Sequence, residues 1–253
     1  VALRAGVPIE KPALTVNRLC GSGIQSIVSA AQMIQLDEAR TCLVGGMESM
    51  SQAPHVIWGA RSGFKLGQGK LEDWLMVSLT DGYCGFAMAQ TAENLARKYE
   101  ISREDQDAFA LRSQQLAAAA YEAGRLQEEI VPVEIKSRKG STMFAQDDHM
   151  RPETTMEILA KLPTAFSKDG FVTAGNASGI VDGASALTIA SEESASSMGL
   201  KPIGRIVSYA AAGVEPSEMG IGPVPATKAA LERAGLSLSD IDLIEVNEAF
   251  AAQ

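Results

Sequence analysis

Apolar residues recur every three to four positions between residues 22 and 36, which is the spacing of one face of a helix. These positions are Ile24, Ile27, Val28, Ala31 and Ile34. Short apolar runs at 12–16 and 41–44 lie on either side, and the second ends in Gly45-Gly46. We expect both runs to be strands, so this part of the chain predicts a strand–helix–strand unit within a parallel sheet.

The periodicity fades from residue 49 to residue 83, where glycines and isolated aromatic residues interrupt it. We therefore expect an inserted region that is rich in loops. Two helices follow, and the first is expected at 91–100. The second begins after Ser102, a favoured N-cap residue, has Asp105 at its third position and ends at Gly124.

The second half of the chain alternates apolar runs with glycine-rich loops. Strands are expected at 130–136, 185–190, 203–209 and 242–246. A helix is expected to end near Gly235, after a loop at 213–225. The Gly-, Ala- and Ser-rich segment at 166–183 is expected to bring its backbone close to a ligand or to another segment.

Two polar side chains follow expected strands and precede expected helices. They are Cys20, after the first apolar run, and Asn247, after the last one. In open α/β sheets ligands bind at the carboxyl ends of strands, so both residues are candidate site residues.

Cys20 carries the most specific chemical signal, because Gly21-Ser22-Gly23 follows it directly. A helix start stabilises a thiolate through its dipole and its free N–H groups, and glycines let a substrate approach the sulfur. This arrangement predicts nucleophilic acyl chemistry on sulfur. The other two thiols, Cys42 and Cys84, lack such a setting and are expected to be structural.

Composition narrows the possible classes of protein. A net charge of -9 argues against a nucleic-acid binder, so an anionic substrate would need a local basic patch. Three cysteines without disulfide or metal-ligand spacing, and only two histidines, predict a reduced, intracellular protein without a metal site. No apolar stretch is long enough for membrane insertion. The expected location is the cytoplasm of a bacterium, or the mitochondrial matrix or a peroxisome of a eukaryote.

Four motifs together resemble the thiolase family, in the order in which that family carries them. Residues 17–23 read Asn-Arg-Leu-Cys-Gly-Ser-Gly and residues 91–94 read Thr-Ala-Glu-Asn. Residues 173–179 read Thr-Ala-Gly-Asn-Ala-Ser-Gly and residues 247–250 read Asn-Glu-Ala-Phe. The motifs are spread over nearly the whole chain, so the resemblance covers essentially all of it.

The resemblance implies a role for each matching residue. Cys20 would be the nucleophile that carries the acyl group, and Asn247 would hold a water against the thioester or ketone oxygen. Ser178 would contact the pantetheine arm of coenzyme A, and Arg151 would lie near its nucleotide end. The remaining coenzyme A and acyl-chain contacts would be Leu79, Met88, Phe166, Ala174, Gly175 and Phe250.

The reaction that the resemblance implies is acyl transfer through an acyl-cysteine intermediate. A 3-ketoacyl-CoA would be cleaved to acetyl-CoA and a shortened acyl-CoA, as in fatty acid β-oxidation, or the reverse condensation would occur. Coenzyme A would be a substrate, and no cofactor would be bound permanently. Ala87 stands where the acetoacetyl-CoA branch of the family typically has a histidine, which favours the 3-ketoacyl-CoA branch.

Two alternatives stay open. One is a biosynthetic acetoacetyl-CoA thiolase. The other is a thiolase-like protein that binds acyl-CoA or lipid without catalysis, although a thiol at a helix start serves no purpose in pure binding.

The expected architecture is α/β and thiolase-like, with layered α/β/α/β/α half-domains. Residues 1–48 and 180–200 would form part of the first half-domain, 49–179 a loop domain covering coenzyme A, and 201–253 the start of the second half-domain. The family's Gly-His-Pro and Cys-x-Gly-Gly-Gly motifs do not occur, so we expect a fragment, truncated at both ends, that is inactive alone. The family also implies a homodimer or homotetramer.

Overall fold

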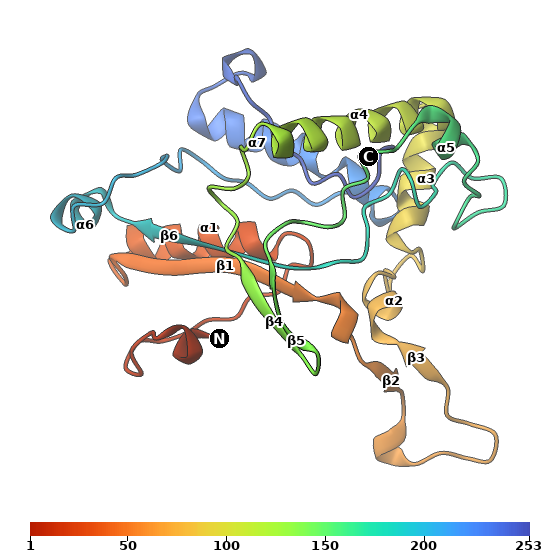
Figure 1. Cartoon of the computed structure of the whole chain (residues 1–253), viewed down its shortest axis with the longest axis horizontal. Coiled ribbons are helices and arrows are strands. Elements are labelled where there is room, and N and C mark those ends of the chain that lie inside the picture. Colours follow the sequence, from red (N-terminus) through yellow and green to blue (C-terminus); the bar gives the residue numbers. More distant parts are fainter. The chain divides into compact units, whose positions relative to one another are not determined.

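We describe residues 1–253 from a computed structural model (Figure 1). The two longest strands are β1 (Thr41–Ser49) and β6 (Asp182–Ala190), and they pair with each other in antiparallel orientation over their full length. The chain divides into two units, one of residues 1–51 and 182–209 and the other of residues 52–181 and 210–253.

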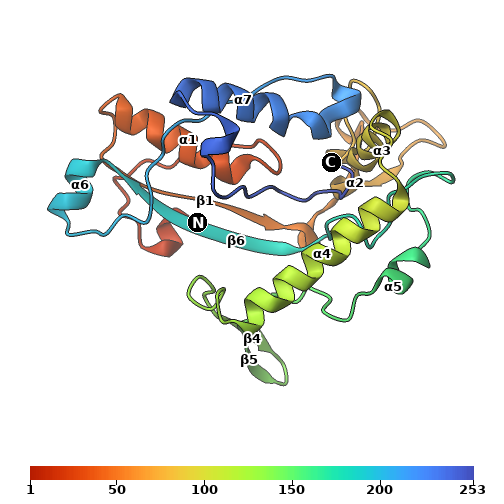
Figure 2. The same ribbon diagram turned by 90° about the horizontal axis from the view of Figure 1, so that it is seen from above.

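Unit 1 is built from the β1–β6 pair and α1 (Ser22–Gln35), which runs along it (Figures 1 and 2). Glycine makes this approach possible, because a Cβ on Gly46 would lie 3.2 Å from the Cα of Gly23. The backbone N–H of Gly45 donates to the hydroxyl of Ser26 on the helix, at 3.1 Å. The helix therefore meets the middle of β1 at its own first turns.

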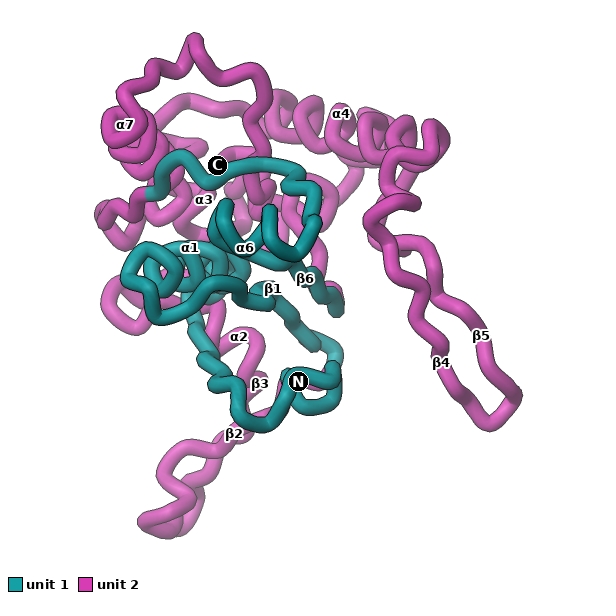
Figure 3. The backbone as a smooth tube through the Cα atoms, turned by 90° about the vertical axis from the view of Figure 1, so that its left-hand side faces the viewer, with its two compact units in different colours: residues 1–51, 182–209 teal, residues 52–181, 210–253 magenta.

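Unit 2, magenta in Figure 3, contains most of the buried core. The helix α3 (Met88–Lys98) buries one stripe of alanines, and this stripe packs against Val172 and Ala252. The helices α4 (Arg103–Glu122) and α5 (Met156–Ala160) contact each other, and α7 (Pro223–Ala234) follows the short helix η4 (Pro216–Ile221). Small side chains thus allow helix, loop and C-terminal segment to pack closely.

The remaining elements are short. Two antiparallel hairpins belong to unit 2, and two short helices and several 3₁₀ turns connect other segments. They are β2 (His55–Ile57) with β3 (Leu71–Asp73), β4 (Val133–Ser137) with β5 (Gly140–Phe144), α2 (Trp74–Ser78), α6 (Glu192–Ser197), η1 (Ala2–Ala5), η2 (Met50–Gln52), η3 (Ala60–Ser62) and η5 (Leu238–Asp240).

The structure confirms the elements whose ends carry a clear local signal. The helix α1 covers the predicted helix at 22–36, and α4 begins after Ser102 with the predicted cap and ends before Gly124. The helix α7 ends at Gly235, whose φ of 69° suits glycine. The strand β6 includes the predicted strand at 185–190, and residues 49–83 are loop-rich with short elements.

Three predicted strands are wrong. Residues 12–16, 203–209 and 242–246 are irregular. Most of their apolar side chains are exposed, for example Leu14 at 70% and Leu243 at 86%. A strand is stable only beside another strand, and within residues 1–253 none of these segments has one. These segments have the apolar pattern of a strand, but they lack a partner strand with which to form a sheet.

The predicted parallel strand–helix–strand unit is also wrong, since all three strand pairs are antiparallel. Nor does β1 end at Gly45-Gly46, because these glycines lie inside it. The strand predicted at 130–136 begins later, at Val133, and no helix starts after Asn247. The division into half-domains and a loop domain stays a prediction.

Candidate active site

Cys20 lies in a tight turn that leads directly into α1. Leu19, the residue before it, has a φ of 46°, a left-handed conformation that is unfavourable for a side chain of this size. The turn is closed by local hydrogen bonds, since the Ser22 hydroxyl accepts from the N–H of Arg18 at 2.9 Å and donates to the Leu19 carbonyl at 2.7 Å. The thiol is thus held at a strained corner of the backbone.

The N-terminus of α1 lacks a side-chain cap. Its N-cap residue is Gly21, which has no side chain that could accept from the first N–H groups. The positive end of the helix dipole is therefore left without a capping side chain next to Cys20. The N–H groups of Gly21 and Ser22 donate instead to the carbonyls of Arg18 and Leu19, at 2.9 and 3.0 Å.

The three thiols differ in exposure. Cys20 is exposed, whereas Cys42 and Cys84 are half-buried. Burial raises the pKa of the Cys42 thiol, which lies within β1. Cys84 lies beside Asp81, whose carboxylate accepts backbone N–H groups from Cys84 and Tyr83 at 2.8 Å, and these bonds hold the pKa of Asp81 below its usual value.

The glycine-rich loop at 171–179 pairs with the end of the chain. The N–H of Ser178 donates to the carbonyl of Ala249, and the N–H of Ala251 donates to the carbonyl of Asn176, both at 2.9 Å. Ala177 and Phe250 lie opposite each other between these bonds. The structure thus brings predicted coenzyme A contacts, Ser178 and Phe250, onto one short ladder.

A buried carboxylate on α3 fixes the start of this loop. Glu93 is 1% exposed, and its carboxylate accepts from the backbone N–H groups of Phe171 and Val172 at 2.9 Å. Arg97, one turn along the helix, lies 3.6 Å from the same carboxylate. Since two backbone donors and one cation surround it, the buried charge is compensated.

A second buried carboxylate, Asp107 on α4, holds the middle of the loop. Its Oδ1 accepts from the Asn176 amide at 2.9 Å, and its Oδ2 accepts from Arg103 Nε at 2.7 Å. Asp107 is 2% exposed and Asn176 is 3% exposed. Because water does not reach these polar groups, the protein partners must satisfy their hydrogen bonds.

Two loop glycines allow close contact with neighbouring side chains. A Cβ on Gly175 would lie 2.4 Å from Leu159 Cδ2, and a Cβ on Gly179 would lie 2.0 Å from the His149 ring. The glycine content predicted that the backbone of this loop approaches a ligand or another segment closely. At Gly175 and Gly179 it approaches side chains of other segments. Because His149 lies on Gly179, the segment that carries Arg151 lies beside Ser178.

The other predicted contacts are placed as follows. Leu79 accepts from the N–H of Met88 at 3.0 Å, at the junction between α2 and α3, and both residues are half-buried. Phe166 is 41% exposed. Arg151 is exposed and its guanidinium donates to the carbonyl of Asp148 at 2.6 Å. Ala174 and Asn247 are also exposed.

Cys20 belongs to unit 1, and the other predicted site residues belong to unit 2. Their assignment to one site stays a prediction. Sequence reasoning missed Glu93, Asp107 and Asn176 as residues that shape the loop. One signal was present, because Glu93 lies in the same helical stripe as Ala89, Ala92 and Ala96, where a solvated carboxylate is not expected.

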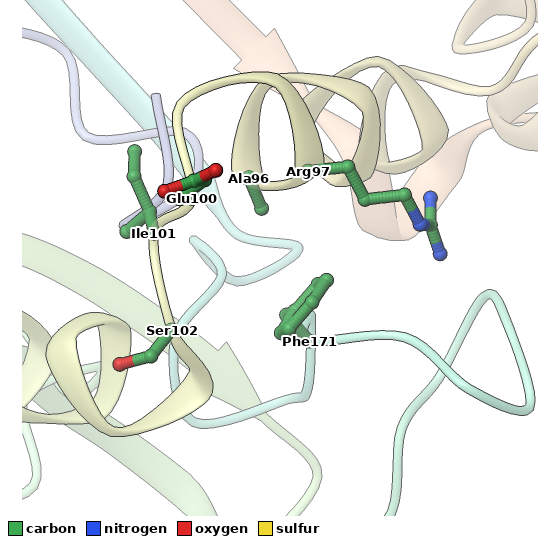
Figure 4. A pocket seen from close by; sticks show the side chains of 6 residues that line it. All are labelled: Ala96, Arg97, Glu100, Ile101, Ser102 and Phe171. Carbon is green, nitrogen blue, oxygen red and sulfur yellow. The ribbon is translucent and has the colours of Figure 1, made fainter.

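A cavity of about 340 Å³ lies at the end of α3, and Figure 4 shows the side chains that line it. Its lining residues are Ala96, Arg97, Glu100, Ile101, Ser102 and Phe171. At one side of the cavity, the Arg97 guanidinium lies 5.8 Å from the centre of the Phe171 ring. None of the predicted site residues lines this cavity.

Two further findings concern metals and membranes. No group of three or more His, Cys, Asp or Glu side chains is arranged to hold a metal ion. None of the helices combines the length and the apolar character that crossing a membrane requires.

Comparison with known proteins identifies relatives along the whole chain. The family model of the thiolase N-terminal domain matches residues 1–193, and that of the thiolase C-terminal domain matches residues 200–253. The chain is 57% identical to the mitochondrial 3-ketoacyl-CoA thiolase of Homo sapiens over 254 aligned residues. It aligns over its full length but spans only 64% of that relative.

Solved structures agree with this result. The crystal structure of human mitochondrial 3-ketoacyl-CoA thiolase in complex with CoA superimposes with a TM-score of 0.95 at 56% identity, covering 99% of this chain and 62% of that one. The Bacillus anthracis acetyl-CoA acetyltransferase gives a TM-score of 0.96 at 48% identity, covering 99% and 64%. The fold is the thiolase-like α/β fold that the motifs predicted, and the chain belongs to the thiolase family.

Proposed function

We propose that this chain supplies the acyl-carrying and coenzyme-binding parts of an acetyl-CoA C-acyltransferase that cleaves 3-ketoacyl-CoA. The observation that carries the proposal is the exposed Cys20, at a strained turn beside an uncapped helix start. The 57% identity to human mitochondrial 3-ketoacyl-CoA thiolase supports the substrate class.

In the proposed reaction the Cys20 thiolate attacks the keto carbon of a 3-ketoacyl-CoA. A C–S bond forms, the C–C bond to the acetyl unit breaks, and acetyl-CoA leaves as an enolate that takes up a proton. The thiolate of a second coenzyme A then attacks the acyl group, which releases Cys20. Each attack passes through an oxyanion that needs fixed donors, and the backbone N–H of Cys20, next to the start of α1, is a suitable one.

The remaining roles follow from the family resemblance. Asn247 would position a water against the reacting oxygen, and Ser178 would bind the pantetheine arm. Arg151 would lie near the nucleotide end, and Leu79, Met88, Phe166, Ala174, Gly175 and Phe250 would complete the coenzyme A and acyl-chain contacts. Residues 1–253 contain neither a Gly-His-Pro nor a Cys-x-Gly-Gly-Gly motif, so none of these residues is assigned the proton transfers.

The test replaces Cys20 by Ala and by Ser in the full-length protein and measures thiolysis of acetoacetyl-CoA and of longer 3-ketoacyl-CoA substrates. We expect the rate to fall by about 10³-fold or more, because the covalent route is lost. Mass spectrometry of the quenched wild type should find the acyl group on Cys20. An active Cys20→Ala variant, or acylation at another residue, would overturn the proposal.

The same assay distinguishes the two alternatives. A biosynthetic acetoacetyl-CoA thiolase would act on acetoacetyl-CoA alone and reject longer chains. A binding protein would retain coenzyme A without turnover of any thioester. Ala87, the N-cap residue of α3 next to Met88, favours the 3-ketoacyl-CoA branch.

The polypeptide of residues 1–253 taken alone should not catalyse thiolysis, because it lacks the family's acid and base motifs. Purified 253-residue chain is assayed with acetoacetyl-CoA and coenzyme A, beside the full-length protein as the positive control. Measurable turnover by the shorter chain would contradict this expectation.

The resemblance also supports assembly and location. We propose a homodimer or homotetramer, which light scattering coupled to gel filtration would measure. The human relative is named as mitochondrial, and a matrix or peroxisomal location is proposed for a eukaryotic source and a cytoplasmic one for a bacterial source.

A further inference from the structure

The oxygen and both N–H groups of the Asn176 side-chain amide are hydrogen-bonded. Its Oδ1 accepts from the N–H of Thr173 at 2.8 Å, and its Nδ2 donates to the carbonyl of Phe171 at 3.0 Å. The second Nδ2 hydrogen goes to Asp107 Oδ1 at 2.9 Å. A buried amide with all its groups paired has a single orientation, so the loop around it is fixed as well.

The backbone of the same residue fixes the segment that follows Asn247. Its carbonyl accepts from the N–H of Ala251, and two residues later the N–H of Ser178 donates to Ala249, both at 2.9 Å. Ala249 is only two positions after Asn247. Asn176 therefore joins the proposed coenzyme contact Ser178 to the segment that carries the proposed catalytic residue Asn247.

Asp107 is in turn bound by Arg103. The same arginine binds the backbone of two residues whose side chains pack against Gly175. Arg103 Nε donates to Asp107 at 2.7 Å, and Arg103 Nη2 donates to the carbonyls of Leu159 and Leu162 at 2.6 and 3.2 Å. The side chains of Leu159 and Leu162 are the atoms that a Cβ on Gly175 would meet. One ion pair thus determines both the partner of Asn176 and the packing of Gly175.

Stability alone does not require charged groups at this place. Apolar residues of similar volume often stabilise a buried site as well as an ion pair does, and a polar network favours one conformation over others. The conformation selected here is that of a loop within two residues of Ser178 and of Gly175. We propose that Asn176, held by Asp107, is a positioning residue that sets the geometry of both Ser178 and the Asn247 segment, an inference that rests on the proposed function.

The first test compares Asn176→Ala with Gln106→Ala in the full-length protein. Gln106 is a matched control, because it is also buried and its amide bonds only to the Ile101 carbonyl, at 3.2 Å, next to Asp107 on α4. Displacements of about 1 Å can cost about 100-fold in rate, so Asn176→Ala should lower kcat by about 10- to 100-fold and raise the KM for coenzyme A by about 5-fold or more. Gln106→Ala should lower the melting temperature and leave both constants unchanged.

The second test exchanges the two partners and stays informative if Asn176→Ala does not fold. Asn176→Asp places two carboxylates against each other and should impair kcat and KM strongly. Asp107→Asn offers one acceptor to two donors, Arg103 and Asn176, and should impair both constants less than Asn176→Asp does. In the double variant an amide at 107 donates to a carboxylate at 176, so adding Asp107→Asn to Asn176→Asp should recover at least about 5-fold in kcat/KM. A role in stability alone predicts that the melting temperature changes among these variants while kcat/KM of the folded protein does not.

A binding measurement separates this inference from the proposed function. The dissociation constant of coenzyme A is measured calorimetrically in a Cys20→Ala background, with and without Asn176→Ala. Weaker binding with Asn176→Ala supports positioning even if the wild type cleaves no thioester, in which case the proposed function fails alone. An active wild type whose kcat, KM and coenzyme A affinity are all unaffected by Asn176→Ala and Asn176→Asp overturns the inference and leaves the proposed function intact.

Discussion

Cys20 differs from the other two thiols in ways that its reactivity should report. It is exposed, whereas Cys42 and Cys84 are half-buried, and burial raises the pKa of the Cys42 thiol. We expect iodoacetamide to alkylate Cys20 first near neutral pH, because the thiolate is the reacting species. Peptide mass mapping during the reaction would measure the order. Faster labelling of Cys42 or Cys84 would contradict the proposed activation.

Single residues were predictable where their chemistry is local. Cys20 could be selected because its neighbours Gly21-Ser22-Gly23 lie next to it in the sequence. The roles of Glu93 and Asp107 could not, because each depends on a loop about 70 to 80 positions away that only folding brings near. The alanine stripe around Glu93 indicates that this carboxylate is buried, but the pattern does not show which backbone groups it binds.

At the level of single elements, the cap of α4 makes a measurable contribution. The Ser102 hydroxyl accepts from the N–H of Asp105 at 3.0 Å, and the Asp105 carboxylate accepts in return from the N–H of Ser102 at 3.3 Å. Ser102→Ala should lower the free energy of unfolding by about 1 kcal/mol. Urea denaturation measures this loss. The control is Gln115→Ala, at an exposed position of the same helix, which should change stability by no more than about 0.5 kcal/mol.

The β1–β6 pair tolerates a side chain at one glycine and not at another. A Cβ on Gly45 would lie 2.1 Å from the carbonyl oxygen of Ser185, which is backbone and cannot move aside, whereas a Cβ on Gly183 meets nothing within 4 Å. We expect Gly45→Ala to destabilise unit 1 by about 1–3 kcal/mol or more. Gly183→Ala should be neutral or stabilising, by up to about 1 kcal/mol. Equal urea midpoints for the two variants would contradict this difference.

Helices were predicted better than strands for a physical reason. The ends of α4 and α7 are marked by Ser102 and by Gly235, whose capping effects act within a few residues. A strand depends on a partner from elsewhere in the chain, and the pairing of β1 with β6 is not visible in either segment alone. For that reason the orientation of the sheet and the three unpaired runs were predicted wrongly.

For the molecule as a whole, acid should be destabilising. Hydrogen bonds from Ser51 hold the pKa of Asp182 below its ordinary 3.8, and bonds from Lys70 and Trp58 lower the pKa of Glu72 below 4.5. A lowered folded-state pKa stabilises the fold above the unfolded value and this contribution is lost as pH falls through the folded value. Stability should therefore decline as pH falls below about 4.5.

The variant Asp182→Asn isolates one of these groups. Its urea midpoint should lie below that of the wild type at pH 6, and the gap should narrow towards pH 3, because the wild type loses the carboxylate there. Glu10→Gln, at an exposed position of the same unit, serves as the control and should keep the wild-type pH profile. A gap that stays constant down to pH 3 would argue against a role for the Asp182 charge.

Contacts between distant parts of the chain affect how this sequence can be recombined with its relatives. The two thiolase models meet between residues 193 and 200, which makes that point an attractive crossover for building hybrids. Yet Ser178 with Ala249, and Lys98 with Glu218, join one side of this boundary to the other within unit 2. The backbone bonds are available to any parent, but the ion pair depends on side chains, so a hybrid keeps it only if residues 98 and 218 come from the same parent.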